Sequence, residues 1–227
     1  LFRSPNARRV LEKVADEDVS NEAFPYMTAK AITIGTIQAY ALRLSYAGEL
    51  GWEIYCSSEQ GLALWDALWE AGREFDIIAA GAGCFGSLRL EKGYRAWGSD
   101  IHTEVNPYEA GLGWAVRLNK GDFMGREALV KAKAEGLKQK LCVLTSSDPQ
   151  AVAMGSEPVL TLDGKKIGFV TSVDYGYSVG KLIMLAMLPI EYAVTGTEVR
   201  VRYFDGELTA VVAPDPLFDP QMERLKG

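Results

Sequence analysis

The sequence predicts an α+β fold, an antiparallel sheet with helices on one face, followed by a C-terminal all-β domain. Three patterns indicate this class. Alternating apolar and polar residues predict strands between residues 28 and 57. Apolar residues at helical spacing predict helices on either side of that region. Six short β-type runs without helices follow residue 136, which is typical of a small barrel or sandwich.

The first part of the chain holds a helix and the strands of the sheet. Ser4 and Pro5 form a helix-start signal, so a helix capped by Ser4 is expected over residues 5–15. The alternation then predicts strands over residues 28–34, 37–46 and 52–57. Gly48 and Gly51 fall in the connection before the last strand, where a positive φ costs glycine little. The last two strands are therefore expected to form a hairpin.

Further helices are expected after this sheet. Ser57 and Ser58 open one whose apolar stripe includes Trp65 and Trp69, a pair more typical of a core than of a ligand cage. Two more helices are predicted over residues 82–92 and 125–135. Gly136 suits both a helix end and a domain boundary. The expected division is an α+β domain over residues 1–136 and an all-β domain over residues 137–227.

The second domain is expected to be built from short strands and tight turns. Asp163-Gly164 and Asp205-Gly206 are two-residue hairpin signals. Gly176 and Gly180 flank a segment with no helix pattern after it, so turn chemistry explains them better than a phosphate cradle does. Strands are predicted over residues 140–145, 159–162, 166–171, 182–188, 198–203 and 207–212.

Composition excludes several functional classes. The formal net charge of −6 and the scattered basic residues argue against a nucleic-acid binder. No apolar run is long enough to predict a membrane span. A single histidine, His102, argues against a multi-histidine metal site, and no metal is expected. The three cysteines (Cys56, Cys84 and Cys142) are widely spaced and odd in number, which favours buried thiols and a reducing, cytoplasmic location.

The predicted hairpin carries the first candidate site. Tyr46 lies seven residues before Glu53, and a hairpin would bring both near one end of the sheet. An ionised carboxylate presents two adjacent acceptor oxygens, which suit a ligand with two parallel N–H donors, such as a guanidinium or the amide edge of a pterin. The spacing alone is explained as well by a solvated strand glutamate beside a half-buried rim aromatic. The hairpin by itself therefore does not identify a function.

A resemblance over a longer part of the chain indicates a function. The segment Tyr46-Ala-Gly-Glu-Leu-Gly-Trp-Glu-Ile54 resembles the Tyr-Thr-Gly-Glu-x-Gly-x-Glu-Ile segment of the aminomethyltransferase (glycine-cleavage T-protein) family. Residues 87–100 are similar to that family's Ser-Leu-Arg-Leu-Glu-x-Gly segment ending in Gly-x-Asp. Later blocks resemble the family in the same order, over residues 107–114, 120–129, 168–172, 176–180 and 216–220. Details in residues 91–97 are closest to the folate-binding half of dimethylglycine and sarcosine dehydrogenases and oxidases.

The resemblance implies a C-terminal all-β barrel domain and tetrahydrofolate as cofactor. It implies that Glu53 accepts from the pterin amide edge and that Tyr46 lies beside it. Arg95 and Trp97 lie in a Gly-rich loop and are expected to line the mouth of the folate cavity, because binding residues concentrate in loops. In such enzymes the methylene of a methylated amine (glycine, sarcosine or dimethylglycine type) is captured as 5,10-methylenetetrahydrofolate. The chain itself is expected to be an N-terminally incomplete member, inactive alone, and a flavin domain is expected upstream if the protein is of the dehydrogenase type.

Two departures from the family pattern limit this assignment. The T-protein has a folate-contacting arginine two residues before Ser87, where this chain has Phe85, and a neutral ring cannot replace a guanidinium. The family's aspartate near the reactive folate nitrogen matches no residue here, so the catalytic residues are unknown. Arg89 and Glu91 are expected to make structural ion pairs instead. Two alternatives stay open: a folate-dependent O- or S-demethylase, and a non-catalytic folate-binding module.

Overall fold

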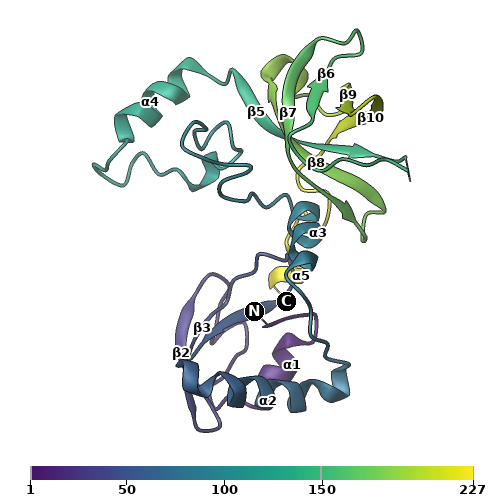
Figure 1. Cartoon of the computed structure of the whole chain (residues 1–227). Coiled ribbons are helices and arrows are strands. Elements are labelled where there is room, and N and C mark those ends of the chain that lie inside the picture. Colours follow the sequence, from purple (N-terminus) through teal and green to yellow (C-terminus); the bar gives the residue numbers. More distant parts are fainter. Residues whose placement is uncertain (1, 149, 227) are drawn as a thin grey trace. The chain divides into compact units, whose positions relative to one another are not determined.

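The computed structural model describes residues 2–148 and 150–226, and its internal contacts divide them into two compact units. The first unit comprises residues 1–88 together with 219–227, and the second comprises residues 89–218 (Figure 1). Residues 89–136 therefore group with the β-rich part of the chain. The domain boundary expected at residue 136 stays a prediction, because compact units of contacts need not coincide with domains.

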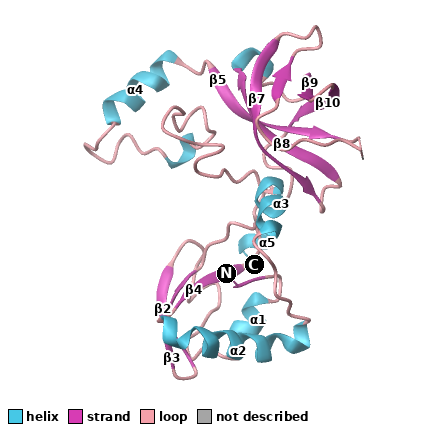
Figure 2. Ribbon diagram, in the orientation of Figure 1, coloured by secondary structure: helices cyan, strands magenta, loops and turns pink. Residues whose placement is uncertain are grey.

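The first unit contains a four-stranded sheet in the order β1-β4-β3-β2, of which Figure 2 labels β2, β3 and β4. Its strands are β1 (Phe2–Arg3), β2 (Ala29–Ile34), β3 (Ile37–Leu42) and β4 (Gly51–Tyr55), and all pairings are antiparallel. Period-2 alternation assigns the faces: Ala39 and Ala41 are buried, whereas Tyr40 between them is 52% exposed. One face of the sheet is therefore packed and the other is open.

The first unit also contains several helices. They are α1 (Ala7–Leu11), α2 (Gly61–Gly72), the start of α3 (Gly83–Glu91) and α5 (Glu223–Lys226), with 3-10 turns η1 (Ser58–Gln60) and η2 (Arg73–Phe75). Ala7 and Leu11 of α1 and Leu64 of α2 pack in one apolar cluster with Ile32, Ile34 and Trp52 of the sheet. The predicted helices over 58–72 and 82–92 are confirmed.

Two predictions about local structure in this unit are wrong. The helix expected over residues 5–15 spans only Ala7–Leu11, and Ser4 is not its N-cap: its hydroxyl accepts from the backbone N–H of Asn6 instead. The strand expected over residues 37–46 ends at Leu42, and the next residue, Arg43, is buried. Its guanidinium donates to the carbonyls of Phe24, at 2.6 Å, and Lys226, at 2.5 Å.

The second unit is dominated by a closed antiparallel barrel, which confirms the fold class. The barrel order is β10-β5-β8-β7-β6-β9 (Figure 2). Outside the barrel lie the end of α3, the turns η3 (Gly113–Ala115) and η4 (Ile190–Tyr192), and helix α4 (Arg126–Glu135). The barrel strands are β5 (Gln139–Ser146), β6 (Pro158–Leu160), β7 (Lys166–Gly176), β8 (Lys181–Pro189), β9 (Glu198–Tyr203) and β10 (Gly206–Ala213).

Inward-facing residues of every barrel strand fill its core. Leu144, Val159, Val170, Met184 and Val201 are among the fully buried members of this cluster. Gly164 joins β6 to β7 in the predicted turn with a positive φ of 89°. The turn expected at Asp205-Gly206 is shifted by one residue: Gly206 pairs with Tyr203, so Phe204 and Asp205 form the loop.

Candidate functional site

Glu53 lies in the middle of β4, between β1 and β3. Its cross-strand partner on β3 is Leu42. The neighbouring Trp52 is fully buried in the core on the helix side of the sheet. Because successive side chains of a strand point to opposite faces, Glu53 is directed to the open face, together with Gly51 and Tyr55. Its side chain is 20% exposed, which makes the carboxylate accessible without leaving it fully solvated.

Both oxygens of the Glu53 carboxylate have protein partners. The Tyr55 hydroxyl donates to Oε2 at 2.7 Å, and Nη2 of Arg3 lies 3.5 Å from Oε1. The hydrogen bond to Glu53 and the negative charge of Glu53 raise the pKa of Tyr55. An ionised carboxylate has about four lone-pair sites. The Tyr55 hydroxyl occupies one of these sites, and Arg3 makes an ionic contact without a hydrogen bond, so the group keeps acceptor capacity for further donors on the open face.

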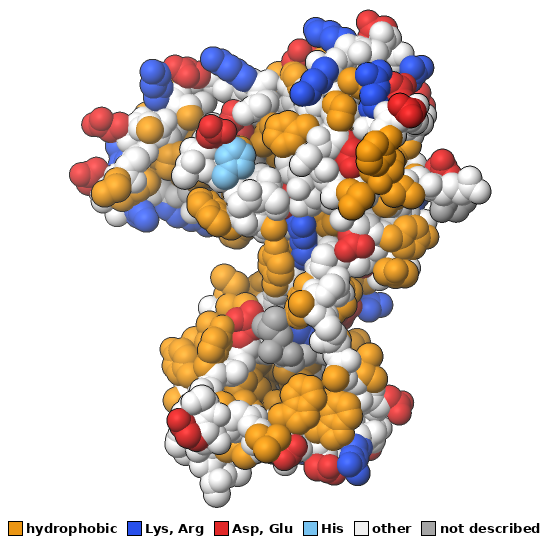
Figure 3. All heavy atoms as spheres, viewed as in Figure 1, with side chains coloured by type: hydrophobic (Ala, Val, Ile, Leu, Met, Phe, Trp, Pro, Cys, Tyr) orange, Lys and Arg blue, Asp and Glu red, His pale blue; other side chains and the backbone are white. Residues whose placement is uncertain are grey.

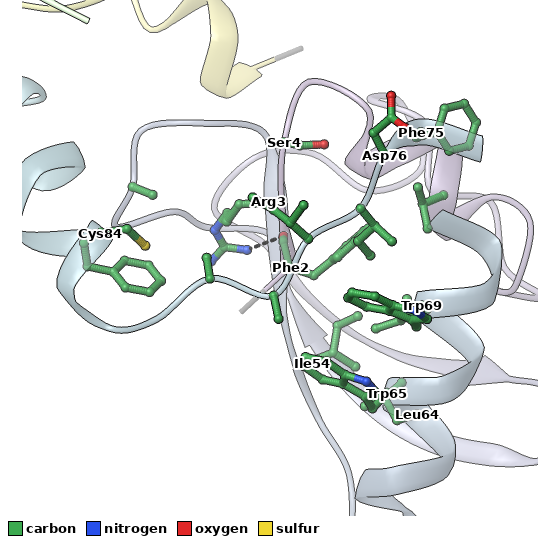
Figure 4. A pocket seen from close by; sticks show the side chains of 18 of the residues that line it. Phe2, Arg3, Ser4, Ile54, Leu64, Trp65, Trp69, Phe75, Asp76 and Cys84 are labelled. Carbon is green, nitrogen blue, oxygen red and sulfur yellow. Dashed lines mark hydrogen bonds between the residues drawn. The ribbon is translucent and has the colours of Figure 1, made fainter. Parts of the chain in front are cut away.

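Arg3 is the buried charge beside this carboxylate. Its side chain is 9% exposed, and Nη1 donates to the carbonyl of Phe2 at 2.9 Å (Figure 4). Nε and Nη2 make no hydrogen bond within the described residues. Burial lowers the pKa of Arg3 to about 10, and the charge of Glu53 opposes this shift. The guanidinium is thus still a cation at neutral pH.

Tyr46 belongs to the connection between β3 and β4, which runs over residues 43–50, and not to a strand. Its side chain is 36% exposed, while the flanking Ala47 is buried. Gly48 has a positive φ of 77°, as a turn in this connection requires. The expected hairpin is present, because β3 and β4 pair antiparallel, but its connection is longer than predicted, since β3 ends at Leu42. Both residues belong to the first unit, with Glu53 on a strand and Tyr46 on a longer loop.

A pocket of about 750 Å³ lies in the same unit, on the side of α2 (Figure 4). The indoles of Trp65 and Trp69 stack there, with ring centroids 5.7 Å apart and planes 12° apart. Trp65 is 53% exposed, so this pair is not the closed core that its spacing predicts. Phe85, which stands where the resembled family has arginine, also lines the pocket. Figure 3 shows hydrophobic side chains gathered on the visible surface of this unit.

Arg95 and Trp97 belong to the second unit, in the loop after α3. Arg95 donates to the carbonyls of Ala110, at 2.9 Å, and Gly93, and its Nη2 lies 2.5 Å from Oδ2 of Asp215. Its guanidinium therefore holds the loop to the end of the barrel sequence. Trp97 is 76% exposed and offers an open indole face. The structure brings Arg3, Glu53 and Tyr55 into contact within one unit, and it describes Arg95 and Trp97 within the other.

Arg89 and Glu91 both have structural partners, as predicted. They do not pair with each other, and only Arg89 forms an ion pair. Arg89 forms an ion pair with Asp100 at 2.5 Å and donates to the Ser172 hydroxyl at 2.7 Å. Glu91 accepts from the backbone N–H groups of Ser178, at 2.6 Å, and Val179, at 3.4 Å. These side chains connect α3 to the barrel strand β7 and the turn that follows it.

Sequence reasoning missed two of the three residues at the carboxylate. Tyr55 had a usable signal, because it lies two residues after Glu53 on the same strand and thus on the same face. Arg3 had none, since the pairing of β1 with β4 joins residues about fifty positions apart. Within the described residues, no cluster of three or more metal-ligating side chains is present. No helix there has the length and apolar character needed to cross a membrane.

Comparisons with known proteins place this geometry in context. Residues 3–120 match the family model of the GCVT N-terminal domain, and residues 139–219 match that of the glycine cleavage T-protein C-terminal barrel domain. The chain is 39% identical to mitochondrial dimethylglycine dehydrogenase of Homo sapiens, over 98% of this chain and 26% of that protein. It is 35% identical to an aminomethyltransferase of Caldanaerobacter subterraneus, over 93% of this chain and 56% of that protein.

A solved structure shows the same relationship in three dimensions. The glycine cleavage system aminomethyltransferase T from Bartonella henselae superposes with a TM-score of 0.79 at 26% identity, over 92% of this chain and 56% of that one. The chain thus spans about a quarter of the length of the dehydrogenase and about half that of the aminomethyltransferases.

Proposed function

Because the chain belongs to the glycine-cleavage T-protein family, we propose that it is the tetrahydrofolate-binding part of a one-carbon transferase. In the proposed reaction a methylated amine of the glycine, sarcosine or dimethylglycine type supplies a methylene group, and 5,10-methylenetetrahydrofolate is the product. The relatives named as aminomethyltransferases and as dimethylglycine and sarcosine dehydrogenases support this substrate class. The intact protein is proposed to be the enzyme, and these residues its folate-binding portion.

The Glu53 carboxylate is the observation that carries the proposal. It lies on the open face of the sheet, partly exposed, and after the hydrogen bond from Tyr55 is counted both of its oxygens keep acceptor positions. The amide edge of a pterin presents two adjacent N–H donors, which is the complementary pattern. Hydrogen bonds to an ionised acceptor are the strong ones. The chemistry of this donor and acceptor set therefore fits tetrahydrofolate.

The other proposed folate contacts have different strengths. Tyr46 offers a half-exposed ring and a hydroxyl on the loop that leads into β4. Trp97 offers an exposed indole, which suits stacking on a flat ring. Arg95 already donates to oxygens of Ala110, Gly93 and Asp215, so its proposed contribution is to hold the loop that carries Trp97. Tetrahydrofolate supplies the nucleophilic nitrogen, and the residues here bind and orient it.

The proposal also covers the rest of the full-length protein and its location in the cell. The dimethylglycine and sarcosine dehydrogenases are about four times as long as this chain, so a flavin domain in the full-length protein is proposed to generate the one-carbon unit. The three cysteines are unpaired, which supports a reducing location, the cytoplasm. The general acid or base of the transfer is not assigned to any residue of this chain.

Isothermal titration of the full-length protein with tetrahydrofolate tests the proposal. Glu53→Gln keeps the shape of the side chain and removes its charge, so we expect the Kd to rise about 10- to 100-fold, since one or two charge-assisted hydrogen bonds are lost. Glu70→Gln is the matched control, because Glu70 lies exposed on α2 in the same unit. Equal affinity of wild type and Glu53→Gln would overturn the proposed role of Glu53.

A turnover assay tests the donor class separately. Sarcosine and dimethylglycine are supplied as methyl donors to the full-length protein, with and without tetrahydrofolate. Formation of 5,10-methylenetetrahydrofolate supports the proposed transfer. Methylated folate formed only from O- or S-methyl donors would assign the protein to the demethylases, and tight folate binding without turnover would assign it to the binding modules.

A further inference from the structure

The side chain of Arg3 passes over Gly51 to reach Glu53. In the register of β1 on β4, Arg3 is the direct partner of Gly51, so the side chain of Arg3 lies on the same face as Glu53. A Cβ atom at position 51 would lie 2.6 Å from Cδ of Arg3 and 2.9 Å from its Nη1, and it would also collide with the carbonyl of Phe2. Only glycine at this position therefore lets the guanidinium lie across β4.

The burial of Arg3 is not explained by fold stability. The guanidinium is nine-tenths buried, yet Nε and Nη2 make no hydrogen bond within the described part of the chain. A buried charge whose donors are unused is unfavourable, and an apolar side chain of similar size is often as stable or more stable. The contact that needs a cation here is Glu53, whose Oε1 lies 3.5 Å from Nη2.

Tyr55 holds the second oxygen from the other side. It lies two residues after Glu53 on the same face of β4, and its hydroxyl donates to Oε2 at 2.7 Å. Tyr55 by a hydrogen bond and Arg3 by an ionic contact thus reach different oxygens of one carboxylate, so rotation about its terminal bond would break at least one contact. A carboxylate held at both oxygens presents its remaining lone pairs in one fixed plane, which two parallel N–H donors require.

We infer that Arg3 and Tyr55 are positioning residues, which fix the Glu53 carboxylate so that it receives the two N–H donors of the pterin. This inference rests on the proposed function of Glu53 and extends it to two residues that act through Glu53. The site thereby draws on two strands: β4 supplies the acceptor and its tyrosine, and the edge strand β1 supplies the cation. Gly51 makes the contact between Arg3 and Glu53 possible, because any larger residue there would collide with the Arg3 side chain.

A double-mutant cycle on the full-length protein tests the inference. The Kd of tetrahydrofolate is measured for wild type, Arg3→Met, Glu53→Gln and the variant with both substitutions. Arg3→Met removes the charge and keeps an unbranched side chain, and we expect it to raise the Kd about tenfold. If Arg3 acts through Glu53, the double variant binds no more weakly than Glu53→Gln alone, because the two effects share one interaction.

Conservative variants separate positioning from general destabilisation. Arg3→Lys keeps a cation within reach and is expected to recover part of the affinity lost in Arg3→Met, which a purely structural defect would not predict. Tyr55→Phe is expected to weaken binding about threefold to tenfold. Tyr40→Phe is its matched control, because Tyr40 is the cross-strand partner of Tyr55 and is equally exposed. Tyr55→Phe also tests the inference if Arg3→Met does not fold.

A spectroscopic readout reports on the cluster without folate. The charge of Arg3 lowers the pKa of Tyr55, against the upward effects of Glu53. In NMR titrations of protein labelled with 13C-tyrosine, Arg3→Met is therefore expected to raise the pKa of Tyr55 further, and Glu53→Gln to lower it.

The outcomes distinguish this inference from the function on which it rests. If Glu53→Gln leaves folate affinity unchanged, the proposed function of Glu53 fails. If Glu53→Gln weakens binding while Arg3→Met and Tyr55→Phe bind as wild type does, the proposed function stands and the positioning role is wrong. Additive losses in the double variant would also overturn it, since Arg3 would then act independently of Glu53.

Discussion

Oδ2 of Asp100 lies 2.5 Å from Nη1 of Arg89 in the interior of the second unit, and the side chain of Asp100 has no exposed surface. The same carboxylate accepts from the backbone N–H of Ala96, at 2.8 Å, and from the hydroxyl of Thr171, at 2.6 Å. One acidic side chain therefore joins the end of α3, the loop after it and the barrel strand β7.

Asp100→Asn should destabilise the protein strongly. The substitution leaves the Arg89 cation buried without its charge partner, and breaking a buried pair typically costs about 3–5 kcal/mol. The free energy of unfolding, measured by urea titration, checks this. Glu135→Gln is the control, because Glu135 forms an exposed pair with Lys131 on α4 and should change stability by less than about 1 kcal/mol. Equal effects of the two variants would contradict the structural role of Asp100.

Cys142 should make the folded state sensitive to alkali. Burial raises the pKa of the Cys142 thiol to about 11, above its ordinary value of 9.0. The folded state thus keeps the proton more tightly than the unfolded state does. The resulting stabilisation is complete below pH 9 and is lost as the pH rises to about 11, by an amount on the order of 2 kcal/mol.

The Cys142 prediction is measured as a difference between variants. Unfolding free energies of wild type and Cys142→Ala are compared at pH 8, 9, 10 and 11, so that other groups titrating in this range cancel. The gap between the two proteins should change by about 2 kcal/mol in favour of the variant. Cys84→Ala is the control. A constant gap would show that the Cys142 thiol ionises equally in both states.

Gly51→Ala should disturb the edge of the first sheet. The added Cβ would collide with the Phe2 carbonyl and with Cδ of Arg3, and overpacking of this kind costs about 1–3 kcal/mol. Gly61→Ala is the matched control, because the same atom would meet nothing within 4 Å there and alanine favours the helix α2. Urea unfolding measures both, and a stable Gly51→Ala protein would refute the close packing of β1 on β4.

Leu225 should matter to the first unit although it lies near the end of the chain. It is 1% exposed, and truncating a buried leucine to alanine costs about 2–5 kcal/mol. Leu62→Ala is the control, because Leu62 is 73% exposed and should change stability by about 0.5 kcal/mol or less. Protection of the β3 and β4 amides against hydrogen exchange should fall in Leu225→Ala and not in Leu62→Ala.

The predictions that the structure confirms depend on local patterns. The sequence predicts the barrel strands because each short segment carries its own alternation of apolar and polar residues and is followed by turn residues, as in residues 198–203 and 207–212. Helix α4 was found with its glycine end for the same reason. The Asp205-Gly206 pair predicts the turn after β9 one residue late, because Gly206 pairs with Tyr203 and the loop is formed by Phe204 and Asp205.

The predictions that failed depend on contacts between distant residues. The strand expected over residues 37–46 stops at Leu42, and the buried Arg43 after it donates to a carbonyl 183 positions away, a partner that no local pattern indicates. The motif predicts Glu53 as a folate contact, but the contact of Glu53 with Arg3 depends on an edge strand of two residues, which is too short to leave a periodic signal. Tyr55 is predictable from the sequence, because the period of a strand places it on the same face as Glu53.

The membership of residues 219–227 in the first unit affects how the chain can fold during synthesis. A ribosome releases the sheet and its helices first, then the whole barrel, and only afterwards the segment with Leu225 and the Lys226 carbonyl. The guanidinium of Arg43 must therefore wait for its second acceptor until about 180 further residues have been translated. A premature stop codon after the last barrel strand would leave that barrel intact and damage the sheet made at the beginning.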